Sequence, residues 1–281
     1  METINMSNKQ VDFVIVGAQK SGTTSLAGQL NQLDSICFCT EKEPHFFSKD
    51  KNWQNNIDKY LALYSDAPGQ LLGEASTTYT FCDEYPDAIA SLYEHNPNIK
   101  LIYLVRDPVA RIESHFNHRL RNGRVTRDMM SSLGQHPCFF ERSEYNRQLE
   151  HIKKTVPEQQ IKVIIFEEYT KNPQKILAEV LAFLSLAHDQ AANIDFSPKN
   201  VSDASLKMNS PLLKGLINLI AKLPMSYKLA RWLPIKVKLS LAEKRVLWRT
   251  LEGDVSELEK HLNRPLTQWR SKYMYNKGSR L

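Results

Sequence analysis

The chain has 281 residues, of which 42% are hydrophobic and 24% are charged, and its formal net charge is +6. These proportions are ordinary for a globular protein and exclude a chain too polar to bury a core. A moderately basic chain favours anionic ligands such as nucleotides, acidic glycans, nucleic acid or anionic membrane, although the same charge is equally compatible with a simple effect on solubility.

The N-terminal segment and the cysteines both indicate a protein of a reducing compartment. Residues 1–10 are polar and lack the apolar core of a signal peptide, and every apolar stretch is interrupted before the roughly 18 residues of a transmembrane helix. The cysteines have no regular spacing and no histidine pair at zinc-finger spacing, so we expect free thiols and no metal site: Cys37, Cys39, Cys82 and Cys138. We therefore expect a cytoplasmic protein, or one peripheral to a membrane.

Strand and helix patterns alternate along the chain. In chain order they predict a strand at 11–17, a helix at 21–33, strands at 37–39, 71–74 and 101–105, helices at 109–121 and 141–154, a strand at 161–166, a helix at 172–184 and closing helices at 241–269. This alternation predicts an α/β, P-loop-like three-layer fold, in which helices cover both faces of a central parallel sheet. We expect one domain over residues 1–281, with a core over about 11–190 and a C-terminal helical region over about 200–281.

The strongest local signal lies between the first strand and the first helix. A glycine-bounded turn there would present backbone N–H groups, a helix N-terminus, a lysine ammonium and several hydroxyls to an anion: Gly17, Lys20, Ser21, Gly22, Thr23 and Thr24. The spacing differs from the nucleoside-triphosphate loop G-x-x-x-x-G-K-[ST], because the lysine precedes the second glycine. A shorter loop suits one 5′-phosphate with a single attached group and needs no Mg²⁺. The alternative is a chance turn that only caps the helix.

The loop and three later motifs resemble the sulfotransferases that use 3′-phosphoadenosine-5′-phosphosulfate (PAPS). The sequence G-x-x-K-S-G-T-T resembles the 5′-phosphosulfate loop of that family, and further similarities follow in the family's order over residues 106–114, 166–184 and 258–269. The resemblance covers about residues 12–269 and implies transfer of a sulfuryl group from PAPS, with 3′,5′-ADP as product and no metal. The acceptor would be a hydroxyl or an amine, with a carbohydrate or glycolipid expected, and it would attack the sulfur in line, opposite the leaving phosphate oxygen.

The resemblance also implies a 3′-phosphate site that contains Arg106 and Ser114. Arg106 follows a predicted strand, where its planar guanidinium suits phosphate oxygens. Ser114 lies about two turns into the next predicted helix and would meet the phosphate from the side. Arg111 shares a helix face with Ser114, and we expect it to form a salt bridge on a solvated face.

A third stretch, Glu41 to Phe47, resembles the E-x-H-F-F segment of glycan sulfotransferases, especially the heparan sulfate 3-O type. The resemblance implies that Glu43 is the general base, that His45 orients or assists it, and that Lys20 neutralises the leaving oxygen. Because a residue before proline favours extended backbone, we expect Glu43 and His45 to point the same way from an extended chain. The alternative is a surface ion-pair partner at Glu43 and a structural histidine at His45.

The chain departs from the glycan enzymes beside Glu74, where they usually carry a catalytic lysine and this chain has Ala75. Together with the absence of a recognised membrane anchor, this indicates a soluble, bacterial-type member. The acceptor therefore stays open among carbohydrate, lipid-linked and natural-product compounds. Glu74 and Ser76 lie at the expected site without an assigned role. Lys199 lies in a late polar loop, for which a simple surface loop is the expected structure and a loop folded over the nucleotide is the alternative.

Residues 212–241 combine many Leu and Ile residues with Lys and Arg and contain no acid. Core-packing helices are the expected structure, and peripheral contact with an anionic membrane is the alternative. The sequence leaves two alternative functions for the whole chain. A P-loop kinase or nucleotide hydrolase would need Mg²⁺ and the longer loop. A nucleic-acid-binding protein would need aromatic residues interleaved with Lys and Arg, and the sequence shows no such pattern, so no nucleic-acid partner is expected.

Overall fold

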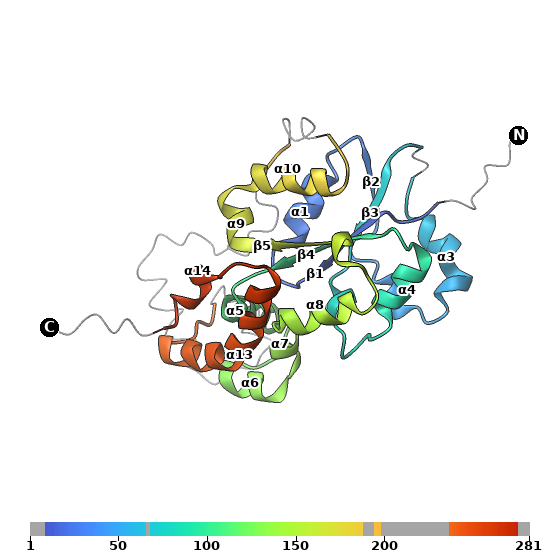
Figure 1. Cartoon of the computed structure of the whole chain (residues 1–281). Helices are drawn as coiled ribbons and strands as arrows, with labels where there is room; N and C mark the ends of the chain where they lie inside the picture. The colour runs from blue at the N-terminus through green and yellow to red at the C-terminus, as the bar shows by residue number, and fades with distance from the viewer. Residues whose placement is uncertain (1–8, 66–67, 188–193, 198–235, 275–281) are drawn as a thin grey trace, which may run out of the picture. The chain divides into compact units, whose positions relative to one another are not determined.

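The structure is a computed structural model that describes residues 9–65, 68–187, 194–197 and 236–274 (Figure 1). The chain divides into two compact units. The first unit contains Met1–Asp107 and Glu144–Lys199, and the second contains Pro108–Ser143 and Asn200–Leu281. Lys199 and residues 212–235 lie outside the described residues, so the expectations for them remain predictions.

The first unit is built on a five-stranded, all-parallel sheet with strand order β2-β3-β1-β4-β5. Its strands are β1 (Phe13–Gly17), β2 (Ile36–Phe38), β3 (Leu71–Ala75), β4 (Lys100–Val105) and β5 (Ile161–Ile165). Runs of Val, Ile and Leu form these strands because helices bury both faces of the sheet. The chain leaves β1 between its two neighbours β3 and β4, so the end of β1 is the switch point at which such sheets bind ligands.

One face of the sheet is covered by α1 (Thr23–Leu30), α9 (Phe166–Lys171) and α10 (Pro173–Phe183) (Figure 1). Phe13 and Ile15 of β1 pack in the same apolar cluster as Leu26 of α1 and Leu177 of α10, and all four are fully buried. The Asn172 side chain accepts a hydrogen bond from the N–H of Lys175 at 3.2 Å and so caps α10, as the Asn-Pro pair predicts.

The opposite face carries α4 (Ala88–His95) and α8 (Tyr145–Lys153). Tyr103 of β4 points to this side and donates a hydrogen bond to Oε1 of Gln148 in α8 at 2.8 Å. The chain segments that connect the strands also contain four short elements: α2 (Phe46–Lys49), α3 (Trp53–Leu61), the 3-10 turn η2 (Thr77–Thr80) and the 3-10 turn η3 (Glu158–Gln160). The three-layer α/β fold expected from the sequence is therefore confirmed.

The second unit is helical and contains α5 (Pro108–Arg121), α6 (Met129–Gln135), α7 (Cys138–Glu141), α13 (Leu241–His261) and α14 (Thr267–Arg270). Glu113 of α5 accepts from the ammonium of Lys244 at 2.9 Å and from the backbone N–H of Leu239 at 2.8 Å, which ties the start of α13 to α5. Ser240 and Glu243 form a complete capping box at that start.

Two details differ from the expectations. Arg111 was expected on a solvated face, but it is fully buried and donates to Ser143 Oγ and to the Phe139 carbonyl, both at 2.6 Å. A buried guanidinium needs such acceptors, and helical spacing alone does not reveal what covers a face. The helix expected over 141–154 is divided, because α7 ends at Glu141 and α8 begins at Tyr145.

Among the described residues, no helix is long and apolar enough to cross a membrane.

Candidate functional site

The predicted anion loop lies where β1 ends and α1 begins, at the switch point of the sheet. Its backbone takes left-handed conformations at Lys20 (φ 74°) and at Gly22 (φ 93°), which caps α1 without a side-chain hydrogen bond. Ser21 is fully buried, and its Oγ has no hydrogen-bond partner among the residues that the structure describes. An unsatisfied buried hydroxyl beside first-turn N–H groups fits an anionic ligand, because that ligand would satisfy both.

Arg106 lies beside this loop. Its Nη1 donates to the carbonyl oxygen of Lys20 at 3.2 Å, and its guanidinium lies 4.7 Å from the centre of the Phe166 ring. Phe166 follows β5, so residues after three neighbouring strands meet here. The backbone N–H of Asp107 donates to Glu167 Oε1 at 3.0 Å and fixes the chain after Arg106.

The two residues expected to bind a 3′-phosphate fall in different compact units. Arg106 is in the first unit, whereas Ser114 is in α5 of the second unit, where it is partly buried. Their pairing therefore stays a prediction.

Glu43 and His45 lie in the first unit, in a segment that connects β2 to α2. The extended backbone expected for them is wrong: both residues have left-handed backbone, with φ 54° at Glu43 and φ 56° at His45. Their side chains nevertheless meet, since His45 Nε2 lies 3.5 Å from Glu43 Oε2. Left-handed backbone is unfavourable for residues other than glycine, so tertiary contacts must hold this segment.

Hydroxyl groups of the turn after β3 supply several of those contacts. Thr77 donates to Glu43 Oε2 at 3.2 Å, and Thr78 Oγ1 lies 2.9 Å from His45 Nδ1. Ser48 Oγ lies 2.6 Å from the same threonine oxygen. The sequence placed residues 74–78 at the strand end, but it gave no signal that they support residues 43–48, because the two stretches are about 30 residues apart.

Burial, together with the smaller effect of the nearby charge of Lys49, lowers the pKa of His45 from 6.5 to about 4. The imidazole is therefore neutral at pH 7. With a proton on Nε2 it faces the Glu43 carboxylate, and its Nδ1 can then accept from the Thr78 hydroxyl.

This depressed pKa predicts a pH dependence of stability. Between pH 6.5 and about 4 the unfolded chain binds a proton at His45 and the folded chain does not, so the free energy of unfolding should fall as the pH falls through this window. Urea unfolding at pH 7 and pH 5 should show a smaller loss for His45→Gln than for the wild type. Equal losses in the two proteins would show that His45 does not titrate in this way.

Glu74 of β3 is completely buried under the same segment. Burial raises its pKa, and hydrogen bonds from Ser76, Tyr60 and Tyr79 oppose that rise. The same burial, together with the charge of Glu74, raises the pKa of Tyr60 and of Tyr79 well above 10. Both phenols therefore stay protonated at neutral pH and can donate.

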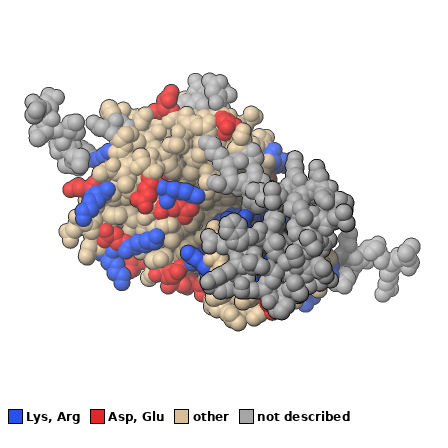
Figure 2. Space-filling view, turned by 180° about the vertical axis from the view of Figure 1, so that it is seen from behind, with Lys and Arg blue, Asp and Glu red and all other residues tan. Residues whose placement is uncertain are grey.

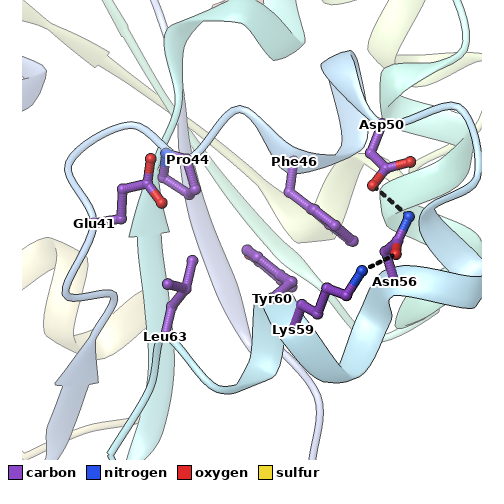
Figure 3. A pocket seen from close by; sticks show the side chains of 8 residues that line it. All are labelled: Glu41, Pro44, Phe46, Asp50, Asn56, Lys59, Tyr60 and Leu63. Atoms are coloured by element: carbon purple, nitrogen blue, oxygen red, sulfur yellow. Dashed lines mark hydrogen bonds between the residues drawn. The ribbon is translucent and has the colours of Figure 1, made fainter.

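A pocket of about 300 Å³ opens beside the segment that carries Glu43. Figure 3 shows the side chains that line it: Glu41, Pro44, Phe46, Asp50, Asn56, Lys59, Tyr60 and Leu63. The rings of Phe46 and Tyr60 are stacked in parallel with their centres 4.4 Å apart. Asn56 donates to Asp50 at 2.9 Å and accepts from Lys59 at 2.9 Å, so the polar side of the pocket is ordered by its own hydrogen bonds.

Charged side chains of both signs are mixed on the face that Figure 2 shows. Over the described residues of this face, Lys and Arg lie among Asp and Glu and form no continuous basic stripe. The described part of this face therefore lacks the basic patch that the nucleic-acid alternative needs.

The fold and the loop define a class of protein, and a comparison with known families identifies it. The sulfotransferase domain model matches residues 10–211, so the chain belongs to the sulfotransferase family. This confirms the family resemblance seen in the sequence. Membership also favours sulfuryl transfer over the kinase and nucleic-acid alternatives.

The relatives within that family are distant. Human heparan sulfate glucosamine 3-O-sulfotransferase 5 is 27% identical over 186 residues, which are 62% of this chain and 53% of the relative. Human heparan sulfate glucosamine 3-O-sulfotransferase 3B1 is 28% identical over 187 residues, which are 62% and 45% of the two chains. The chain thus spans about half the length of the curated relatives that it matches. A sulfotransferase from Alicyclobacillus acidocaldarius is 26% identical in structural alignment, with a TM-score of 0.65 over 93% of this chain and 99% of that one.

A substitution at Gly22 should disturb the loop and Arg106 together. A Cβ atom at this position would lie 2.8 Å from the Phe166 ring, which Arg106 contacts from 4.7 Å. We expect Gly22→Ala to destabilise the protein by about 1–3 kcal/mol and to weaken binding of 3′,5′-ADP. Gly69→Ala is the control, because Gly69 also has left-handed backbone (φ 80°) but nothing within 4 Å. Equal losses of melting temperature and nucleotide affinity in both variants would contradict the role of Phe166.

Proposed function

We propose that this protein transfers the sulfuryl group of PAPS to a hydroxyl or amine of an acceptor molecule. The observation that carries the proposal is the loop at the end of β1, where the buried Ser21 hydroxyl lacks a partner among the described residues and Arg106 contacts the loop backbone. Family membership supports the choice of PAPS over other nucleotides.

Residues of the loop would hold the 5′ end of the donor, namely Gly17, Lys20, Ser21, Gly22, Thr23 and Thr24. Arg106 and Ser114 would bind its 3′-phosphate. When bound, PAPS supplies the sulfuryl group and, as leaving group, 3′,5′-ADP. Glu43 would accept the proton that the acceptor loses, and neutral His45 would orient the Glu43 carboxylate through Nε2. Lys20 would neutralise charge on the departing oxygen.

Calorimetric titration tests the donor site directly. Wild-type protein without metal should bind 3′,5′-ADP with a Kd of about micromolar order and bind 5′-AMP far more weakly, because 5′-AMP lacks the 3′-phosphate. Arg106→Ala should weaken binding of 3′,5′-ADP, whereas Arg147→Ala, which removes the same charge from an ion pair on α8, should not. Binding of Mg²⁺–ATP in place of 3′,5′-ADP would overturn the proposal and favour a kinase-like function.

For the acceptor, we infer a hydroxylated neutral compound or an amine. The support is the pocket beside Glu43, where two carboxylates, Glu41 and Asp50, stand against the single ammonium of Lys59. Pro44 and Phe46 add an apolar wall of the kind that packs against a sugar ring or a lipid-linked chain. A polyanionic glycan would meet repulsion in such a pocket.

An acceptor panel separates these classes. Release of 3′,5′-ADP from PAPS should be stimulated by neutral or amino-sugar oligosaccharides and not by N-sulfated, uronate-containing oligosaccharides. Glu41→Lys should raise KM for an amine acceptor and leave donor affinity unchanged. Preference of the wild type for the sulfated oligosaccharide would overturn the acceptor assignment while leaving the donor assignment intact.

A further inference from the structure

The proposed chemistry assigns no role to the buried carboxyl group of Glu74. Glu74 is the penultimate residue of β3, pairs with Val14 of β1, and is completely buried. Three hydroxyls donate to it: Tyr60 at 2.7 Å and Tyr79 at 2.8 Å to Oε1, and Ser76 at 2.6 Å to Oε2. A carboxylate that accepts several such bonds is held in one orientation, and it fixes the direction of each hydroxyl in turn.

The direction of these hydroxyl hydrogen bonds decides which groups of the segment with Glu43 and His45 the hydroxyl oxygens can accept from. Because the Ser76 hydroxyl donates to Glu74, its oxygen is left to accept, and the backbone N–H of His45 donates to it at 3.0 Å. In the same way, the Tyr79 oxygen accepts from the backbone N–H of Phe47 at 3.4 Å. Both N–H groups lie at the start of α2, where no helical carbonyl can satisfy them.

The third hydroxyl reaches the segment through an aromatic ring. Tyr60 donates to Glu74, and its ring stacks in parallel on Phe46 with the centres 4.4 Å apart. Tyr64 Oη lies 3.1 Å from Tyr60 Oη, so the Tyr64 hydroxyl can donate to Tyr60 and extend this series of hydrogen bonds. Three consecutive residues, His45 to Phe47, are therefore held by groups that Glu74 orients.

We propose that Glu74 is a positioning residue for sulfuryl transfer, which holds residues 45–47 through Ser76, Tyr79 and Tyr60 and so maintains the left-handed backbone of Glu43 and His45. This inference rests on the proposed roles of Glu43 and His45. Glu74 acts through its three hydroxyl partners and does not itself touch the reacting groups. A neutral amide at this position would present an N–H donor to one of the hydroxyls and reverse its direction.

Amide hydrogen exchange tests the geometry without any acceptor. In Glu74→Gln, the N–H groups of His45 and Phe47 should exchange about tenfold faster or more than in the wild type, while those of Ile102 and Leu104 in β4 stay protected. The control is Leu181→Ala, which opens a cavity in the α10 side of the core and destabilises the unit without touching segment 43–47. Exchange at His45 and Phe47 that is unchanged in Glu74→Gln, or raised equally by Leu181→Ala, would overturn the proposal.

Kinetics separate positioning from general stability. With an acceptor found in the panel, Glu74→Gln should lower kcat by about tenfold or more and change the Kd of 3′,5′-ADP by less than about twofold. Leu181→Ala should keep kcat at temperatures well below its melting point. If Glu74→Gln does not fold, Tyr79→Phe provides the second variant, and it should accelerate exchange at Phe47 selectively. A wild type that fails to bind 3′,5′-ADP would refute the proposed function and leave the exchange result as an independent outcome.

Discussion

Glu43→Gln is expected to lower kcat by roughly 100- to 10,000-fold, the usual contribution of a positioned general base. The substitution preserves the shape of the side chain and the possibility of accepting from Thr77, which donates to Glu43 Oε2 at 3.2 Å. It removes only the capacity to take up the acceptor's proton. The affinity for 3′,5′-ADP should not change, because Glu43 belongs to the segment after β2 and not to the loop after β1.

A charge-matched control makes this measurement decisive. Glu94→Gln removes one carboxylate from the exposed surface of α4, where Glu94 accepts a hydrogen bond from Gln54 at 3.5 Å, and should leave kcat unchanged. Both variants should be compared with the wild type under saturating PAPS and acceptor. If Glu43→Gln keeps kcat within about threefold of the wild type, Glu43 is not the base, and its contacts with Thr77 and His45 are structural.

Lys20→Ala is expected to lower kcat by about 100- to 1,000-fold, which corresponds to about 2.7–4 kcal/mol of lost transition-state stabilisation. The backbone of Lys20 is left-handed (φ 74°), and alanine carries the same Cβ atom. The substitution therefore adds no new backbone strain, and the loss reports the ammonium group. Since charge grows on the leaving oxygen as the reaction proceeds, kcat should fall more than the affinity for 3′,5′-ADP.

Two further variants test whether charge or geometry matters at this position. Lys175→Ala removes an exposed lysine from α10, whose nearest acid is 3.9 Å away, and should behave as the wild type. Lys20→Arg keeps the charge with a different shape and should recover part of the rate. Equal losses of kcat in Lys20→Ala and Lys20→Arg, with unchanged kcat in Lys175→Ala, would show that the loop needs the lysine's shape and not its charge alone.

The sheet and the anion loop could be predicted because their signals are local. Short Val/Ile/Leu runs specify buried strands, and Gly17 to Thr24 lies directly between one such run and a helix. The Asn172-Pro173 pair likewise specified the start of α10. In each case neighbouring residues contain all the necessary information.

The backbone conformation and the hydrogen bonds of the candidate site could not be predicted, because they depend mainly on contacts between residues far apart in the sequence. The rule for a residue before proline indicated extended backbone at Glu43, whereas tertiary hydrogen bonds hold it at φ 54°. Nothing near Glu74 in the sequence indicates that Tyr60 donates to the same carboxyl oxygen as Tyr79. Arg111 also lies on a helix with a polar pattern, yet Ser143 and Phe139 enclose it.

The strand order 2-3-1-4-5 separates the residues proposed to bind the acceptor from those proposed to bind the donor. The segment with Glu43, the pocket beside it and the hydroxyl groups that support it all come from the stretch that starts at the end of β2 and closes with η2, on one side of β1. The residues that contact the anion loop, Arg106 and Phe166, follow β4 and β5 on the other side of β1. Under the proposed roles, residues 40–63 can be exchanged as a cassette that alters the choice of acceptor, while the residues proposed to bind the donor stay the same.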